Sequence, residues 1–137
     1  MQIEMISLFY LGLLGLLYAK ISLDTIGMRK KFKISLGHGT NNEIAGYTAA
    51  HANFQAYVPI LFLLAYPLEQ STYLSPILVH TLWMAILAGR VLHYVGIRHA
   101  DRPRFTFRIA GMQLTLWPMI LLATVHIVRY AASWKTP

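Results

Sequence analysis

Polar side chains interrupt an apolar run in the segment AAHANFQAYVPI, at residues 49–60. This segment carries hydrogen-bonding groups at His51, Asn53, Gln55 and Tyr57. Such groups cost free energy in hydrocarbon unless a partner satisfies them, and inside membranes they are typical of functional positions. The pattern therefore indicates either a binding site or a polar packing seam between helices.

Two arginines could bind an anion. Arg90 lies at helical spacing with His93 and Tyr94 and could hold a negative group. The alternative is an arginine that faces its own bundle or extends its head to the membrane surface. Arg108 begins an apolar run, where a cation and the free amides of a helix start would together favour an anion such as a thiolate.

The residue pattern does not predict metal or cysteine chemistry. No intramembrane histidine is paired at i, i+4 with a second type of ligand, so these side chains are expected to form hydrogen bonds between helices. Cysteine is absent, which excludes a disulfide framework and a cysteine nucleophile. We therefore expect no metal, and any thiol must come from a substrate. The histidines concerned are His51, His80, His93 and His126.

The composition indicates a membrane protein. Of the 137 residues, 56% are hydrophobic and 12% are charged, whereas soluble domains carry about 25% charged residues. A net charge of +7 would suggest nucleic-acid binding in a soluble protein. Here the charges lie mainly between apolar segments, so membrane topology explains them and no nucleic-acid partner is expected. The length suits a single domain, residues 1–137.

Four apolar segments predict an all-α membrane protein, built as a bundle of four transmembrane helices. Each segment has about 20 residues or more, which is enough to cross a hydrocarbon core about 30 Å thick. A short turn joins the second segment to the third, so these two form a hairpin. The segments cover residues 5–26, 47–68, 74–97 and 108–134.

The basic residues predict the orientation in the membrane. Eight of the 12 basic residues fall in or beside the loops at residues 27–46 and 98–107. With four spans both loops lie on one side, which the positive-inside rule assigns to the cytoplasm, and both termini lie on the opposite side. The basic cluster also attracts the anionic head groups of membrane lipids. Its members are Arg29, Lys30, Lys31, Lys33, Arg98, Arg102, Arg104 and Arg108.

The predicted second helix is polar on two sides. Since each residue of a helix turns about 100°, Asn53 shares a face with Ala49 and Ala56, whereas His51 and Gln55 lie about 200° away. Neither polar side is suited to lipid. The pattern predicts an oligomer in which one side of this helix faces its own bundle and the other faces a neighbouring subunit. We expect a site on the Asn53 side and a packing seam on the other.

Three stretches of the sequence resemble one known family: HANFQAYVPI, SLDTIGMRKKFKIS and GRVLHYVGIRHADRPRFTFRIAG. Together they resemble the membrane-associated proteins in eicosanoid and glutathione metabolism (MAPEG), which include the microsomal glutathione transferases and have short bacterial members. The likeness extends over nearly the whole chain, and its most specific part is the motif in the second helix. It implies a homotrimer that binds glutathione between neighbouring subunits, near the cytoplasmic face.

The resemblance also implies which residues would form the glutathione site. Arg108 is the best match to the arginine that stabilises the glutathione thiolate, and Arg104 is the alternative because the loop aligns loosely. The remaining candidates match positioning residues of the family or lie beside one. They are Arg29, Lys30, Asn53, Tyr57, Arg90, His93 and Tyr94.

Two alanines depart from the family motif. The motif usually has an arginine where this chain has Ala49 and a glutamate where it has Ala56. Those side chains would hold the charged groups of glutathione, and a charge-assisted hydrogen bond is worth about 1.5–3 kcal/mol. Losing both would weaken binding about a hundredfold or more, at about 1.4 kcal/mol per tenfold.

Two functions from different classes follow. The first is a glutathione-dependent transferase or peroxidase that acts on lipophilic electrophiles or lipid hydroperoxides. The second is a non-catalytic or weakly active protein of the same fold that binds lipid or a protein partner, as the two alanines suggest. A small multidrug exporter is a weaker third hypothesis. It needs a membrane-embedded carboxylate, and the acidic residues, Asp24 among them, fall at segment ends or in loops.

Overall fold

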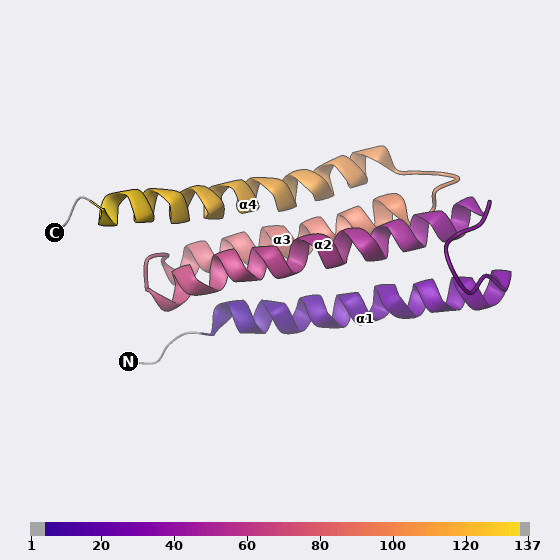
Figure 1. Ribbon diagram of the computed structural model, residues 1–137, viewed down its shortest axis with the longest axis horizontal. Helices are drawn as coiled ribbons and strands as arrows, with labels where there is room; N and C mark the ends of the chain where they lie inside the picture. The colour runs from indigo at the N-terminus through magenta and orange to yellow at the C-terminus, as the bar shows by residue number, and fades with distance from the viewer. Residues whose placement is uncertain (1–4, 135–137) are drawn as a thin grey trace.

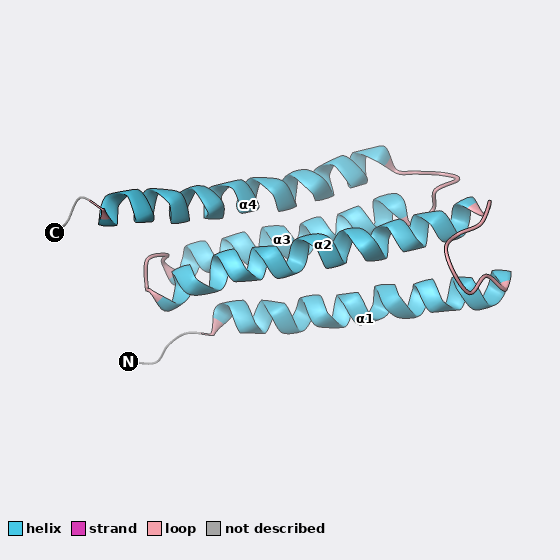
Figure 2. Cartoon of the chain, viewed as in Figure 1, coloured by secondary structure: helices cyan, strands magenta, loops and turns pink. Residues whose placement is uncertain are grey.

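The computed structural model describes residues 5–134, which form four helices (Figures 1 and 2). No strand occurs within this described part, and the predicted all-α four-helix architecture is confirmed. The helices run antiparallel in chain order (Figure 1). They are α1 (Ile6–Phe32), α2 (Asn42–Gln70), α3 (Pro76–Ile97) and α4 (Phe105–Ser133).

Helices α2 and α3 form the middle of the bundle, and α1 and α4 lie on opposite sides of them (Figure 1). Helix α1 packs against α2 and α3, and α4 also packs against α2 and α3. Within residues 5–134, α1 and α4 make no contact with each other. The backbones of α1 and α4 are therefore held apart by the two middle helices in a single chain.

Helices extend further into the loops than the apolar segments indicate. Helix α1 continues past residue 26 to Phe32, and its last turn is basic, which suits the negative end of the helix dipole. Helix α2 begins at Asn42, where the side chain of Asn41 accepts a hydrogen bond from the backbone N–H of Ile44 at 3.1 Å. Helix α4 begins at Phe105, so Arg108 lies within its first turn.

Glycines bring the backbones of α3 and α4 together. A Cβ added at Gly111 would lie 2.5 Å from the backbone nitrogen of His93, and one added at Gly96 would lie 2.5 Å from that of Arg108. Small residues permit such close approach between membrane helices. These contacts fix the first turn of α4, with Arg108, against the end of α3.

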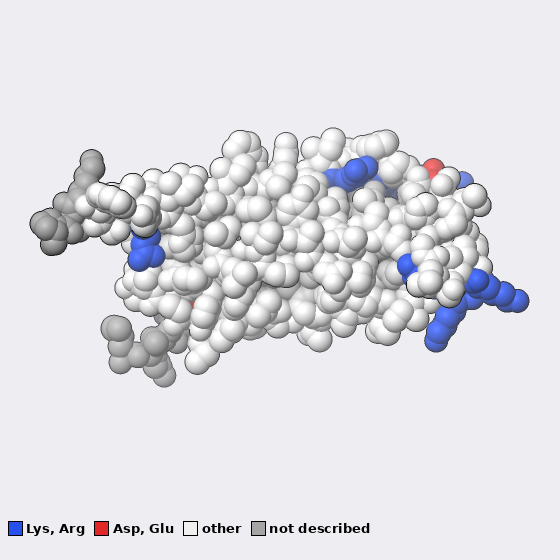
Figure 3. All heavy atoms as spheres, in the orientation of Figure 1, with Lys and Arg blue, Asp and Glu red and all other residues white. Residues whose placement is uncertain are grey.

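The bundle is suited to a membrane. Helices α1, α3 and α4 are long and apolar enough to cross it. Helix α2 is more polar, but its 29 residues span about 43 Å, and it lies alongside the others (Figure 1). Large apolar side chains such as Leu16, Leu63 and Ile127 are exposed. The visible surface is uncharged through the middle, and most of its Lys and Arg residues gather towards the end that carries the loops α1–α2 and α3–α4 (Figure 3).

A carboxylate joins the helices at the opposite end. Glu69, in the last turn of α2, accepts hydrogen bonds from the backbone N–H groups of Ile6 at 2.7 Å and Ser7 at 3.0 Å. The hydroxyl of Ser7 in turn accepts a hydrogen bond from the indole N–H of Trp83 at 2.8 Å. A carboxylate at a helix start satisfies free amides and complements the helix dipole. These bonds attach the start of α1 to both middle helices.

Candidate functional site

Arg90 joins three helices in the interior of the bundle. Its residue exposure is only 2%. Nη1 donates to Oδ1 of Asn53 on α2 at 2.8 Å, and Nη2 donates to Oγ1 of Thr115 on α4 at 2.6 Å. The guanidinium carbon also lies 5.4 Å from the ring centre of Tyr57, within the range of a cation–π interaction. Three predicted site residues, Asn53, Tyr57 and Arg90, are thus brought together within one chain.

No carboxylate takes part in this cluster among the described residues. The Arg90 cation is held by an amide oxygen, a hydroxyl and an aromatic face. Its Nε is buried and has no hydrogen-bond partner within residues 5–134. A buried charge without full pairing is costly, so this arginine is suited to an additional polar or anionic group reaching the interior.

Thr115 is a partner that sequence reasoning missed. Its hydroxyl is fully buried, accepts from Arg90 and donates to the carbonyl of Gly111 at 2.8 Å. The buried residues of α4 are Gly111, Thr115, Pro118 and Leu122, which lie on one face. In the sequence, the available indication of this role was a hydroxyl-bearing residue, Thr115, on the face of an apolar helix that is expected to be buried.

His93 and Tyr94 point to different helices. His93 faces α4, where its Nδ1 lies 3.5 Å from the carbonyl oxygen of Arg108. Tyr94 faces α1 and donates its hydroxyl hydrogen to Asp24. The guanidinium of Arg98 lies over the Tyr94 ring, 5.3 Å from its centre. The spacing of Arg90, His93 and Tyr94 therefore does not produce one anion-binding cluster: Tyr94 belongs to a separate contact with α1.

Asp24 lies within α1 and not at the end of a helix, which corrects one step of the sequence argument. Because α1 continues to Phe32, Asp24 is followed by about two helical turns. Its carboxylate accepts hydrogen bonds from Tyr94 and from Lys20, the latter at 2.6 Å. The carboxylate that an exporter would need is therefore present in a helix, but it is already paired with a cation.

The two thiolate-binding candidates lie near the end of the bundle that carries both basic loops. Arg108 is exposed, and no hydrogen bond or ion pair of its side chain is observed within the described chain. Arg104 precedes the first residue of α4, and its guanidinium lies 5.8 Å from the ring centre of Phe107. Both side chains are exposed on the α4 side of the bundle, where an anion could reach them.

Arg29 and Lys30 lie on the other side of the bundle, at the end of α1. Arg29 donates from Nη1 to the carbonyl of Ser35 at 3.2 Å, and Lys30 is exposed. Since α1 and α4 do not touch, neither residue shares a site with Arg108 in one chain. The structure thus separates the predicted site residues into an α1 group and a group on α2, α3 and α4.

The two alanines that depart from the family motif lie on the outside of the bundle. Ala49 and Ala56 are exposed, as are Ala52, Ile60 and Leu63 on the same side of α2. In the half of this strip that lies nearer the basic loops, the residues are small: Ala49, Ala52 and Ala56. Asn53 on one polar side of α2 contacts Arg90 of the same chain, and His51 on the other contacts the ring of Tyr18 on α1, whereas Gln55 beside His51 is exposed. The surface of α2 left for a neighbour is therefore this strip together with Gln55.

The described residues offer no group of three or more metal-ligating side chains of the His, Cys, Asp or Glu type. Among the intramembrane histidines, His126 lies 2.8 Å from the carbonyl of Leu64, and His80 lies 3.3 Å from the hydroxyl of Tyr10. Each of these contacts joins two helices. This arrangement matches the expected role of these side chains in bonding between helices.

The fold and these contacts define a multi-pass helical membrane protein, and comparison with known proteins gives its family. The model of the MAPEG family matches residues 7–128, so the chain belongs to the MAPEG family. It is 29% identical over 123 residues to the inner membrane protein YecN of Escherichia coli strain K12, covering 90% of this chain and 91% of that protein. The YecN protein of E. coli O6:H1 gives the same values. The resemblance noted in the sequence is confirmed.

Proposed function

We propose that this protein is a membrane-embedded, glutathione-dependent transferase or peroxidase that acts on lipophilic electrophiles or lipid hydroperoxides. The observation that carries the proposal is the exposed, unpaired Arg108 in the first turn of α4. A helix start and a cation together favour a bound anion. Membership of the family supports a thiolate as this anion, because a nearby cation stabilises the thiolate form of a thiol.

The site is proposed to lie between subunits of a homotrimer. Arg29 and Lys30 belong to α1, whereas Arg108 belongs to α4, which lies on the opposite side of the bundle in the same chain. Only a neighbouring copy can bring an α1 cation towards Arg108. The exposed strip of α2 supports this assembly, because Ala49, Ala52 and Ala56 would allow a second helix to approach closely.

The chemistry assigned to the chain is stabilisation of a thiolate. Arg108 holds the sulfur as its thiolate, with Arg104 as the alternative, and the thiol proton passes to solvent. In conjugation, the sulfur forms a bond to the electrophilic carbon. A leaving group departs with the electron pair of its broken bond, or, in an activated alkene, the π pair moves to the far atom, which then takes a proton from solvent. The membrane supplies the apolar partner. Arg29 and Lys30 hold carboxylates, and Asn53 with Tyr57 and Arg90 shapes the inner wall.

The orientation is part of the proposal. The basic loops α1–α2 and α3–α4 are assigned to the cytoplasm, and the ends of the chain to the opposite side. Glutathione would then reach the site from the cytoplasm. Binding is expected to be weak, because Ala49 and Ala56 offer no charge and Asn53 already accepts a hydrogen bond from Arg90.

Turnover of glutathione with a chromogenic electrophile by the purified protein tests this proposal. We expect measurable activity that falls at least tenfold in Arg108→Gln. The matched control is Arg102→Gln, an exposed cation in the same basic region that is outside the proposed site. Absence of turnover, combined with absence of glutathione binding in calorimetry, would refute the proposal.

A second candidate function is a non-catalytic protein that binds lipid or a protein partner. The specific observation in its favour is that the outer strip of α2 is uncharged at Ala49 and Ala56, while Asn53 already accepts a hydrogen bond from Arg90 inside the bundle. The double variant Ala49→Arg, Ala56→Glu separates the two functions. Activity that arises only in this variant favours the non-catalytic role for the natural chain.

A further inference from the structure

A second polar cluster lies between α1 and α3, and the proposed reaction uses none of its residues. Lys20 and Asp24, one turn apart on α1, form an ion pair at 2.6 Å. Asp24 also accepts a hydrogen bond from the hydroxyl of Tyr94 on α3. Two cations lie beside the ring of Tyr94: Lys20 Nζ is 5.9 Å from the ring centre, and the guanidinium carbon of Arg98 is 5.3 Å from it. We call these four residues the α1–α3 cluster.

The α1–α3 cluster carries more positive than negative charge. Its one carboxylate, Asp24, is already paired with Lys20. Within residues 5–134, Arg98 has no carboxylate at ion-pair distance, and its buried Nε has no hydrogen-bond partner. The ammonium of Lys20 has three donors, and its side chain is 59% exposed. An exposed ion pair contributes little to stability, so Lys20 can bind a second anion while it stays close to Asp24.

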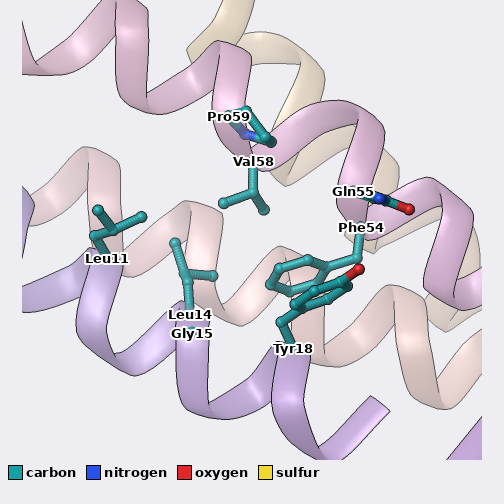
Figure 4. A pocket seen from close by; sticks show the side chains of 8 residues that line it. All are labelled: Leu11, Leu14, Gly15, Tyr18, Phe54, Gln55, Val58 and Pro59. Carbon is teal, nitrogen blue, oxygen red and sulfur yellow. The ribbon is translucent and has the colours of Figure 1, made fainter. Parts of the chain in front are cut away.

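The α1–α3 cluster and the proposed glutathione site lie on opposite flanks of α1. Since each residue of a helix turns about 100°, Lys20 lies about 180° from Arg29 around the axis of α1. The flank that faces α2 carries Arg29 and, further along the helix, an apolar hollow beside Gly15 and Tyr18 (Figure 4). A ligand of the α1–α3 cluster therefore approaches from the other face of the bundle.

The level of the cluster in the membrane suits a carboxylate that is attached directly to an acyl chain. Asp24 lies five residues before Arg29, which is about 7.5 Å along the helix, and it holds the Lys20 ammonium near this level. The head-group zone on each side of a bilayer is about 5–7 Å thick. With Arg29 among the head groups, the ammonium lies where the acyl chains begin. The phosphate of a phospholipid lies further out than this boundary.

Exposed apolar side chains continue from the cluster towards the middle of the membrane. Leu16 lies one turn before Lys20 on α1, and Val91 lies one turn before Tyr94 on α3. Both side chains are exposed, as is Met84 further along α3. Because α1 and α3 both run from the middle of the membrane towards the cluster (Figure 1), these residues can contact one hydrocarbon chain that descends from it.

We propose that the α1–α3 cluster binds the carboxylate of a long-chain fatty acid dissolved in the membrane. Lys20 and Arg98 bind the two carboxylate oxygens beside the ring of Tyr94, and the acyl chain lies along Leu16. Asp24 keeps Lys20 in place and limits the affinity, because its own charge repels the ligand. The site is independent of the proposed function, since no residue of the cluster is assigned to glutathione in the proposed reaction.

The test uses the full chain in phosphatidylcholine vesicles with two photoreactive probes of equal chain length, a fatty acid and the corresponding alcohol. An alkaline buffer ionises the acid, and mass spectrometry maps the labelled peptides. We expect the acid to label the seam between α1 and α3 about fivefold more than the alcohol, because the cluster has one excess positive charge and one basic residue gives about that factor. Labelling is normalised to the hollow between α3 and α4, whose described lining residues carry no charge.

Two substitutions should change this preference in opposite directions. Lys20→Met removes the ammonium, keeps an unbranched apolar stem and should make the two probes label the seam equally. Asp24→Asn removes the repelling charge and should raise the preference for the acid to about twentyfold or more, since two cations then act unopposed. Lys31→Met is the matched control and should leave the preference unchanged, because Lys31 is also an exposed lysine of α1 that pairs with a carboxylate, Glu43, at 3.8 Å.

Three results would overturn the proposal. The first is equal labelling of the seam by the acid and the alcohol in the natural chain, and the second is a preference that Lys20→Met retains. The third is competition by unlabelled phosphatidylglycerol that is as strong as competition by unlabelled fatty acid, which would assign the cluster to phospholipid head groups. A general loss of structure cannot imitate the expected result, because it cannot abolish the preference in Lys20→Met and raise it in Asp24→Asn.

Discussion

The guanidinium of Arg90 donates from Nη1 to Oδ1 of Asn53 at 2.8 Å and so joins α3 to α2 inside the bundle. Asn53 matches the asparagine of the family motif, and in this structure it supports a buried cation. Under the proposed function the same residue would also form part of the inner wall of the site. This double role can be separated by measurement.

Asn53→Ala should destabilise the protein. The substitution leaves a buried charged donor without a partner, which costs about 1–3 kcal/mol. The measurement is the midpoint of thermal unfolding in detergent, compared with Gln55→Ala, whose side chain is exposed on the same helix. An unchanged midpoint in Asn53→Ala would show that the contact with Arg90 contributes nothing to stability.

Thr115→Val should have a similar effect, because it removes the hydroxyl that accepts from Nη2 of Arg90 while keeping the side-chain volume. We expect a loss of about 1–3 kcal/mol in the free energy of unfolding. The exposed Thr124 on the same helix provides the control variant Thr124→Val. If Thr115→Val were as stable as this control, water would be satisfying Arg90 in its place.

Gly111→Ala should disrupt the packing of α4 on α3. The added Cβ would lie 2.5 Å from the backbone nitrogen of His93 and 2.6 Å from the carbonyl oxygen of Gly89, so the helices would have to separate. Low recovery of folded protein, or a strongly reduced unfolding midpoint, is the expected outcome. Gly27→Ala is the control, because a Cβ there meets nothing within 4 Å.

Glu69→Ala should free the start of α1. Removal of the carboxylate leaves the amides of Ile6 and Ser7 without their acceptor and should cost about 0.5–2 kcal/mol, as does loss of a helix cap. Hydrogen exchange should rise in the first turns of α1 and remain unchanged in α4. Glu43→Ala is the comparison, since its ion pair with Lys31 at 3.8 Å lies at the surface and is worth little.

The four helices and the position of the basic loops could be predicted from the sequence, because the mean hydropathy and charge of a segment average over many residues. The ends of the helices could not be predicted in this way, because the last turn of α1, at Arg29 and Lys30, has the basic composition of a loop but the backbone of a helix. Spacing along one helix placed Arg90 and Tyr94 together. The structure separates them, because the helices packed on either side, α4 and α1, offer them Thr115 and Asp24.

The partners of the site residues also depended on contacts distant in sequence. Thr115 lies 25 residues from Arg90, and no local pattern connects an apolar-helix hydroxyl to that arginine. The separation of Arg29 from Arg108 follows from the order of the helices in space. The sequence predicted that Asn53 and Arg90 were unusual, but not that they would bind each other.

The absence of contact between α1 and α4 has a mechanical consequence. Helix α1 is attached to the middle helices through its buried apolar side chains and through hydrogen bonds of Glu69, Ser7 and Asp24, whereas α4 and α3 meet backbone to backbone at Gly111 and Gly96. A force applied to the start of the chain therefore loads α1 without loading α4. We expect single-molecule pulling from that end to extract α1 alone in the first step, with the remaining three helices still in the membrane.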